Sequence, residues 1–224
     1  MNGIMTERTD LKYSMDAAGF VLLSGIVPDI IQEIRYYSTY NFTGDRIDVY
    51  EEPCALLTKE AALALKAVSD EVIRKGYRLK VYDAYRPVRA VRHFVRWAQD
   101  TADIRMKEWF YPDVDKKDLF AQGYIAERSS HSRGSTVDLT LVCMKTGKEI
   151  DTGTPFDLFS SLSWSSCRDI TAEQYGNRML LQEAMIKGGF VPLESEWWHF
   201  TLEDEPYPDT YFDFPVSSAC VKKP

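Results

Sequence analysis

Hydrophobic positions repeat at helical spacing in three segments of the chain. The first runs from a candidate N-cap at Thr58 to Gly76, with apolar positions spaced four, three and four residues apart: Ala61, Leu65, Val68 and Val72. A second stripe, of Val91, Phe94, Val95 and Ala98, follows Pro87, a residue that suits the first turn of a helix. Residues 173–187 form a third segment that two glycines end. The pattern predicts three helices, the first of them clearly amphipathic.

Alternating apolar and polar positions predict strands between these helices. Residues 77–84, 137–142 and 197–202 are predicted as strands, and residues 20–37 are strand-like with a break at Pro28. Within residues 20–37 the period of two predicts one shared face for Ile30, Ile34 and Tyr36. Strands and helices are mixed without regular βαβ alternation, which indicates an α+β fold.

The remaining segments are predicted as irregular. Residues 153–171 are rich in Ser, Gly and aromatic residues without a period, so we expect a long loop that forms a lid or a pocket wall. Residues 100–123 are charged and interrupted by Pro112, and we expect a surface excursion there. No repeat or linker divides the chain, so residues 1–224 are expected to form a single domain, with residues 1–18 as a loose N-terminal arm.

Charge and cysteine usage exclude some classes of function. The net charge is −7 and no basic run occurs, which disfavours a nucleic-acid-binding surface. The apolar residues 17–27 follow acidic residues and are too short for a membrane span, so we interpret them as a buried strand and not as a signal segment. The four cysteines lack a Cys-x-x-Cys pair and are expected to be reduced thiols of a cytoplasmic protein. A periplasmic location stays open for a chain from which a signal segment has been removed.

The first candidate for chemistry combines His131 with Asp138. An odd separation of seven residues would place them on opposite faces of one straight strand. Gly134 lies between them, so we expect His131 on a loop that turns at this glycine and Asp138 on the following strand, both directed into one cleft. Asp138 is surrounded by apolar residues in the sequence, and a buried carboxylate needs a partner. A divalent cation is one such partner; an arginine or a turn amide is the alternative.

The second candidate combines Glu196 with His199. Their separation of three would divide them between the faces of a regular strand, so we expect Glu196 at a bent entry to the strand. The alternative is a surface glutamate and a core histidine. Two imidazoles, one carboxylate and a further glutamate are what a catalytic zinc site requires: three ligands, an open fourth position and a base.

A third motif, Asp-Ala-Tyr-Arg-Pro at residues 83–87, places Arg86 where a strand is predicted to meet a helix. A guanidinium there can bind an oxyanion or a substrate carboxylate. The alternative is a scaffold ion pair with Asp83. His93, the third histidine, lies off the apolar stripe of its helix and is expected to have no function of its own.

Taken together, these motifs resemble those of the D-alanyl-D-alanine dipeptidase family, the zinc dipeptidases of the VanX type. The shared stretches occur in the family's order and cover about residues 36–216: residues 41–44, 83–87, 129–141, 196–199 and 204–215. The resemblance implies a small, mostly antiparallel sheet with flanking helices and a zinc cleft at the sheet, on a fold shared with the hedgehog signalling domain.

The family resemblance also implies roles for the candidate residues. One zinc ion per chain would be held by His131, Asp138 and His199. Glu196 would be the general base for the zinc-activated water, and Arg86 would face the tetrahedral oxyanion.

Three further residues align with family positions that line the substrate pocket: Tyr36, Ser129 and Asp157. The resemblance implies that Asp157 holds the substrate ammonium and that Ser129 lies near the carboxylate end. Related enzymes often carry a histidine pair shortly after the Phe-Asp that corresponds to residues 156–157, and residues 158–164 depart from this pattern. We therefore expect a lid of different shape and a broader preference for dipeptides.

The predicted activity is hydrolysis of free D-Ala-D-Ala to D-alanine by a zinc metallopeptidase. The expected partner is a small dipeptide, and we expect binding to neither nucleic acid nor a membrane. The oligomeric state stays open, and a homo-oligomer is possible. One alternative is a D,D-carboxypeptidase that trims peptidoglycan stem peptides in an open cleft. Another is a binding module with zinc as a scaffold, against which Glu196 argues. Vancomycin resistance and salvage of wall-derived dipeptide share the same chemistry, so the physiological role stays open.

Overall fold

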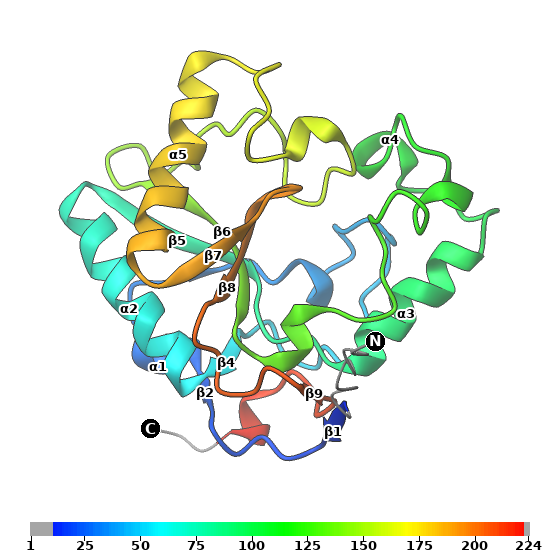
Figure 1. Ribbon diagram of the computed structural model, residues 1–224, viewed down its shortest axis with the longest axis horizontal. Coiled ribbons are helices and arrows are strands. Elements are labelled where there is room, and N and C mark those ends of the chain that lie inside the picture. Colours follow the sequence, from blue (N-terminus) through cyan, green and yellow to red (C-terminus); the bar gives the residue numbers. More distant parts are fainter. Residues whose placement is uncertain (1–10, 222–224) are drawn as a thin grey trace, which may run out of the picture.

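The computed structural model describes residues 11–221, and its centre is a five-stranded mixed sheet (Figure 1). The strand order is β3-β5-β6-β8-β7; β3 is parallel to β5, and the other neighbouring pairs are antiparallel. The strands are β3 (Ile31–Gln32), β5 (Tyr77–Asp83), β6 (Thr136–Cys143), β8 (Glu196–Leu202) and β7 (Phe190–Leu193). The predicted α+β class is confirmed.

Two long helices, α2 (Lys59–Arg74) and α5 (Ala172–Lys187), pack on the sheet and on each other. Local signals place both. The Thr58 hydroxyl accepts a hydrogen bond from the Ala61 amide at the start of α2. A reciprocal capping box between Thr171 and Gln174 starts α5. Both helices were predicted from the sequence, because caps and apolar spacing are local features.

Across the molecule from α2 and α5 lie α3 (Val88–Gln99) and α4 (Lys107–Phe110) (Figure 1). Pro87 precedes α3, as predicted. Val95 of the predicted stripe is only half-buried, and the buried side of α3 consists of Ala90, Val91, Phe94, Trp97 and Ala98.

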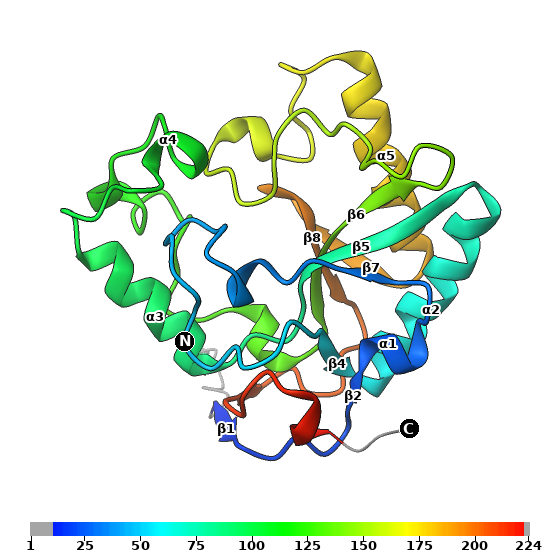
Figure 2. The ribbon, with the colours of Figure 1, turned by 180° about the vertical axis from the view of Figure 1, so that it is seen from behind.

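Two small sheets complete the fold. β2 (Phe20–Leu22) pairs antiparallel with β4 (Leu56–Thr58), and β1 (Lys12–Ser14) pairs parallel with β9 (Thr210–Phe212). Figure 1 shows β1 and β9 side by side at one end of the molecule, and Figure 2 shows the same end from behind. Residues 1–10 of the predicted loose arm lie outside the described residues, and residues 12–14 of it form β1. No helix within residues 11–221 has the length and apolar character needed to cross a membrane.

Several segments differ from the sequence prediction. The strand predicted over residues 20–37 is divided into β2, the short helix α1 (Leu23–Ile26), β3 and a 3-10 helix, η1 (Arg35–Tyr37). Ile30, Ile34 and Tyr36 are all buried, but Ile34 caps η1 and Tyr36 lies in it, and Arg35 between them is buried too, so the predicted shared strand face is absent. β7 was not predicted, because its Pro192 disfavours a strand assignment.

The predicted surface excursion, residues 100–123, is packed and not loose. It contains α4 and a 3-10 helix, η2 (Lys116–Asp118), and buries Phe110, Tyr111 and Leu119. Lys116 is buried as well: its ammonium lies 4.0 Å from the centroid of the Trp97 ring and donates to the Asp103 carbonyl at 2.7 Å. The segment is therefore attached to α3. The other 3-10 helices are η3 (Ser130–Arg133), η4 (Ser161–Ser163) and η5 (Ser218–Cys220).

Candidate active site

The register of the central strands brings three polar residues into one row. Asp83 on β5 pairs with Asp138 on β6, and Asp138 pairs with His199 on β8. Directly paired residues of neighbouring strands point to the same face of a sheet. An irregularity between Val81 and Asp83 shifts the register of β5, and this shift sets Asp83 opposite Asp138.

His131 joins this row from η3, the short helix before β6. The Ser129 hydroxyl accepts a hydrogen bond from the His131 amide at the start of η3, and Gly134 ends it with a φ of 84°. A left-handed φ of this kind favours glycine. The expected loop, turned by Gly134 before the strand that carries Asp138, is therefore present.

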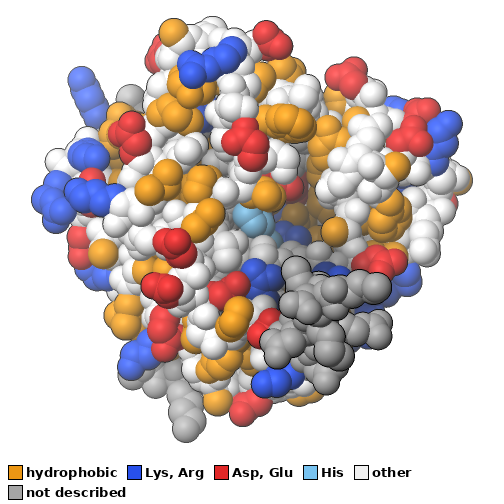
Figure 3. All heavy atoms as spheres, in the orientation of Figure 1, with side chains coloured by type: hydrophobic (Ala, Val, Ile, Leu, Met, Phe, Trp, Pro, Cys, Tyr) orange, Lys and Arg blue, Asp and Glu red, His pale blue; other side chains and the backbone are white. Residues whose placement is uncertain are grey.

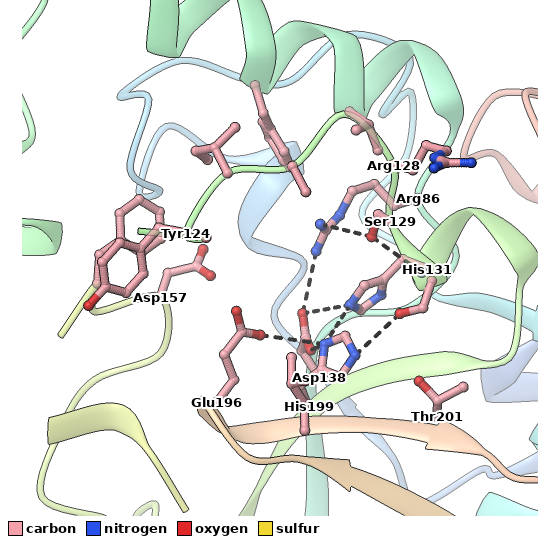
Figure 4. Close-up of a pocket in the computed structure, with 18 of the residues that line it drawn as sticks. Arg86, Tyr124, Arg128, Ser129, His131, Asp138, Asp157, Glu196, His199 and Thr201 are labelled. Carbon is pink, nitrogen blue, oxygen red and sulfur yellow. Dashed lines mark hydrogen bonds and ion pairs between the residues drawn. The ribbon is translucent and has the colours of Figure 1, made fainter. Parts of the chain in front are cut away.

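The side chains of His131, Asp138 and His199 converge at one point (Figure 4). One ligand atom from each lies within 4.8 Å of the other two. His131 Nε2 is 3.2 Å from Asp138 Oδ2 and 3.2 Å from His199 Nδ1, and His199 Nδ1 is 3.1 Å from Asp138 Oδ1. The other ring nitrogen of His131, Nδ1, lies 2.7 Å from the Ala84 carbonyl and donates to it, which leaves Nε2 as an acceptor.

These residues fit a metal ion. Asp138 is buried, yet its Oδ1 accepts no hydrogen bond from any described residue. A buried carboxylate oxygen without a donor needs another positive partner. Two imidazole nitrogens and a carboxylate oxygen form a donor set that suits a divalent transition metal such as zinc.

Electrostatics separate the two histidines. Burial lowers the pKa of His131, although Asp138 opposes this effect. Burial also disfavours the charged form of His199, but the close contact with the Asp138 carboxylate outweighs this effect and raises the pKa of His199. For Asp138 burial raises the pKa, and the two histidines more than reverse this, so its pKa lies well below the usual range. Asp138 is therefore an ionised acceptor between two imidazoles.

Glu196 is the first residue of β8, where the β7–β8 pairing is irregular. One of its carboxylate oxygens lies 3.5 Å from His199 Nδ1, despite the separation of three along the strand. The side chain is 32 % exposed, and burial of the carboxylate in the pocket raises its pKa. A carboxylate thus lies beside the candidate metal ligands.

Arg86 follows β5 and contacts both the scaffold and the pocket. Its Nε donates to Asp83 Oδ2 at 2.8 Å, which is the scaffold ion pair. Its two terminal nitrogens reach into the site, with Nη1 3.5 Å from Ser129 Oγ and Nη2 3.5 Å from Asp138 Oδ2. The guanidinium lies 4.9 Å from the centroid of the Tyr36 ring.

A cavity of about 410 Å³ opens over these residues. Figure 3 shows a histidine at the edge of a hollow in the centre of one face. All eight residues predicted from the sequence line this cavity: Tyr36, Arg86, Ser129, His131, Asp138, Asp157, Glu196 and His199. Asp157 is buried, has a φ of 64° and accepts a hydrogen bond from the Tyr36 hydroxyl at 2.9 Å. Burial raises the pKa of Asp157 well above its ordinary value.

Part of the pocket was not predicted. Residues 123–126 form one wall, although they adjoin the segment expected to be a surface excursion, and residues 191–193 of β7 form another. Tyr124 stacks on Phe159 of the 153–171 loop, with ring centroids 5.3 Å apart. Ser130 was also missed as a neighbour of the site: its hydroxyl lies 3.3 Å from His199 Nε2. No local pattern marks a pocket wall. Ser130 adjoins His131 in the chain, but its contact is with His199, which only the fold brings near.

Comparison with known proteins identifies the family of this chain. The model of the peptidase family M15, described as D-Ala-D-Ala dipeptidase, matches residues 16–217. The chain belongs to this family. The D-alanyl-D-alanine dipeptidase of Enterococcus faecalis (strain ATCC 700802 / V583) is 41% identical over 199 residues, which are 89% of this chain and 98% of the relative. The enzyme of the same name from Enterococcus faecium is 39% identical over 198 residues, 88% of this chain and 98% of the relative. The one from Escherichia coli (strain K12) is 33% identical over 187 residues, 84% of this chain and 86% of the relative.

Membership of the M15 dipeptidase family confirms the resemblance that the sequence motifs indicated. The matched range contains all eight predicted site residues. It also contains the two pocket walls that the sequence motifs did not mark.

Proposed function

We propose that this member of the M15 dipeptidase family is a metallopeptidase that hydrolyses free D-Ala-D-Ala to two molecules of D-alanine. One observation carries the proposal: a carboxylate, Glu196, lies 3.5 Å from a histidine of a buried His131–Asp138–His199 cluster on the floor of a pocket. A purely structural metal site does not require such a base.

One zinc ion per chain is the proposed cofactor. Its ligands are Nε2 of His131, the carboxylate of Asp138 and Nδ1 of His199. When bound, the ion supplies Lewis acidity that polarises the peptide carbonyl and lowers the pKa of water. The Ala84 carbonyl and the Ser130 hydroxyl hold the outer nitrogens of the two imidazoles, at 2.7 and 3.3 Å, and so orient the rings.

Glu196 is the proposed general base. Its carboxylate takes a proton from the attacking water and then delivers it to the amine that leaves the broken peptide bond. The raised pKa of this carboxyl suits both steps, because a base of very low pKa would not hold the proton between them.

Arg86 is proposed to stabilise the oxyanion that develops on the peptide oxygen. Its Nε is bound by Asp83, while the terminal nitrogens make only contacts of 3.5 Å. Those two groups are therefore available to a substrate oxygen, and donors fixed before the reaction are the most effective ones for this purpose.

Asp157 is the proposed partner of the substrate ammonium, with Tyr36 beside it and Ser129 near the substrate carboxylate. Burial without a cation raises the pKa of Asp157, so a bound ammonium restores its charge and gains a strong ion pair. An acylated amine carries no charge and cannot do this.

The arrangement around Asp157 favours a free dipeptide over a peptidoglycan stem peptide. Tyr124 and Asp157 both line the pocket, and the stack of Tyr124 with Phe159 joins the segment at residues 123–126 to the 153–171 loop. A stem peptide would extend from the amino end of the scissile dipeptide, which is the end proposed to face this carboxylate and the aromatic pair.

The test is release of D-alanine from D-Ala-D-Ala, measured with and without a chelator. We expect release that the chelator abolishes and added zinc restores, and no cleavage of an N-acylated pentapeptide ending in D-Ala-D-Ala. Faster cleavage of the pentapeptide would identify a D,D-carboxypeptidase. Zinc binding without hydrolysis of either substrate would identify a binding module.

A further inference from the structure

Tyr50 is a buried residue that does not line the pocket but reaches it through one partner. Its hydroxyl donates to Asp83 Oδ1 at 2.6 Å, and the other oxygen of that carboxylate, Oδ2, accepts from Arg86 Nε at 2.8 Å. Tyr50 and Asp83 are both 1 % exposed, so water does not satisfy either group. The three side chains form a continuous line from the interior to the pocket.

Backbone irregularities occur on both sides of this contact. Val49 has a φ of 62°, in the left-handed region that a β-branched residue rarely adopts. Its carbonyl accepts from the Val216 amide at 2.9 Å, and Tyr50 forms a bridge with Val216, so the tail of the chain holds this conformation. On the other side, the shifted register of β5 sets Asp83 opposite Asp138. Strained backbone conformations that the surrounding structure stabilises are common at functional sites, where a side chain needs a defined orientation.

Asp83 needs both of its hydrogen bonds. It also lies 3.7 Å from Nδ1 of His131, through its Oδ2. A fully buried carboxylate that loses the donor to Oδ1 gains by turning toward other donors. The hydrogen bond from Arg86 Nε to Asp83, which fixes the plane of the guanidinium, would then be distorted. The terminal nitrogens would no longer point into the pocket.

We propose that Tyr50 is a positioning residue, which acts through Asp83 to hold the Arg86 guanidinium in the orientation needed at the reacting carbonyl. This inference rests on the proposed function, in which Arg86 faces the oxyanion. Such a role concerns the transition state more than the bound substrate, because the charge on the peptide oxygen develops only during the reaction.

The experiment compares Tyr50→Phe with a matched control, Tyr82→Phe. Tyr82 is also 1 % exposed and its hydroxyl also donates to a carboxylate, that of Glu149 at 2.8 Å, but Glu149 pairs with Lys80, which does not line the pocket. For Tyr50→Phe we expect kcat to fall about tenfold with KM changed less than about twofold, which corresponds to one hydrogen bond acting on the barrier. Tyr82→Phe should keep the wild-type kcat. Both variants should keep the wild-type zinc content.

Two further measurements separate positioning from a general structural effect. Affinity for a phosphinate analogue of the dipeptide, which carries a tetrahedral anionic centre, should fall by the same factor as kcat/KM in Tyr50→Phe. In an Arg86→Ala background, Tyr50→Phe should cause no additional loss, because the two changes remove the same effect.

The outcomes are distinct. A wild-type kcat in Tyr50→Phe, an equal loss in Tyr82→Phe, or an undiminished loss in the Arg86→Ala background would overturn the inference. Asp83→Asn provides a second route if Tyr50→Phe does not fold: it keeps the side-chain size, and we expect it too to lower kcat more than it raises KM. Absence of D-alanine release by the wild-type protein would instead overturn the proposed function.

Discussion

His131 Nε2 and His199 Nδ1 lie 3.2 Å apart, although 68 residues separate them in the chain. The proton of His131 resides on Nδ1, which donates to the Ala84 carbonyl at 2.7 Å. Its Nε2 therefore presents a lone pair to the other imidazole and to the ionised Asp138. Two imidazole nitrogens and a carboxylate directed at one point are best satisfied by a shared cation.

His131→Ala is expected to abolish zinc binding, because it removes one of three ligands and leaves two. Elemental analysis after dialysis measures the zinc content per chain. His93→Ala is the matched control, because His93 of α3 contacts Asp48 and does not line the pocket. A full equivalent of zinc in His131→Ala would contradict the ligand assignment.

Glu196→Gln is expected to retain zinc and to lower kcat by about 10²–10⁴-fold. The amide keeps the size of the side chain but cannot accept the proton of the attacking water. D-Alanine release and zinc content should be measured on the same preparation. Turnover near that of the wild type would remove Glu196 from the mechanism.

Asp157→Asn is expected to raise KM for D-Ala-D-Ala by about tenfold or more, as loss of a charge-assisted hydrogen bond predicts. The zinc content should stay unchanged, because Asp157 is not among the grouped ligands. An unchanged KM would show that the substrate ammonium binds elsewhere in the pocket. Hydrolysis of an N-acetylated dipeptide, slow in the wild type, should not slow further in this variant.

Two of the four cysteines, Cys143 and Cys54, are expected to react with iodoacetamide in a defined order. Hydrogen bonds from Thr146 lower the pKa of Cys143, whereas burial raises the pKa of Cys54 to about 12. The thiolate is the reactive form of cysteine. Near pH 8 a larger fraction of Cys143 than of Cys54 is thiolate, and the fraction for Cys54 is negligible. Peptide mass mapping over time should find Cys143 modified before Cys54. Modification of Cys54 before Cys143 would contradict the order.

Gly134→Ala is expected to destabilise the protein by about 3 kcal/mol or more, because it adds both backbone strain and a steric clash. A Cβ at Gly134 would lie 2.2 Å from the Phe20 ring, which packs against Phe212 and Phe214. Gly147→Ala is the control: Gly147 has a similar φ of 69° but open space around it, so only strain of about 1 kcal/mol remains. Thermal unfolding measures both. Equal losses in the two variants would mean that Phe20 moves aside.

Much of the local structure, and the kind of chemistry, could be predicted from the order of the residues. The spacing of apolar residues and the cap at Thr58 predicted α2, and alternation predicted β5, β6 and β8. The turn at Gly134 was predicted because a glycine between His131 and Asp138 lets the backbone reverse before the strand begins. These features depend on residues close together in the chain, so they can be recognised before the fold is known.

The way in which distant segments meet became clear only from the folded chain. The row of Asp83, Asp138 and His199 depends on strand register, including a shift in β5 that no local sequence pattern predicts. The contact between Tyr50 and Asp83, and the pocket walls at residues 123–126 and 191–193, depend in the same way on segments far apart in the chain. The physical reason is that register and packing arise from pairing and burial between distant segments, whereas the sequence pattern reports only which face of each segment is apolar.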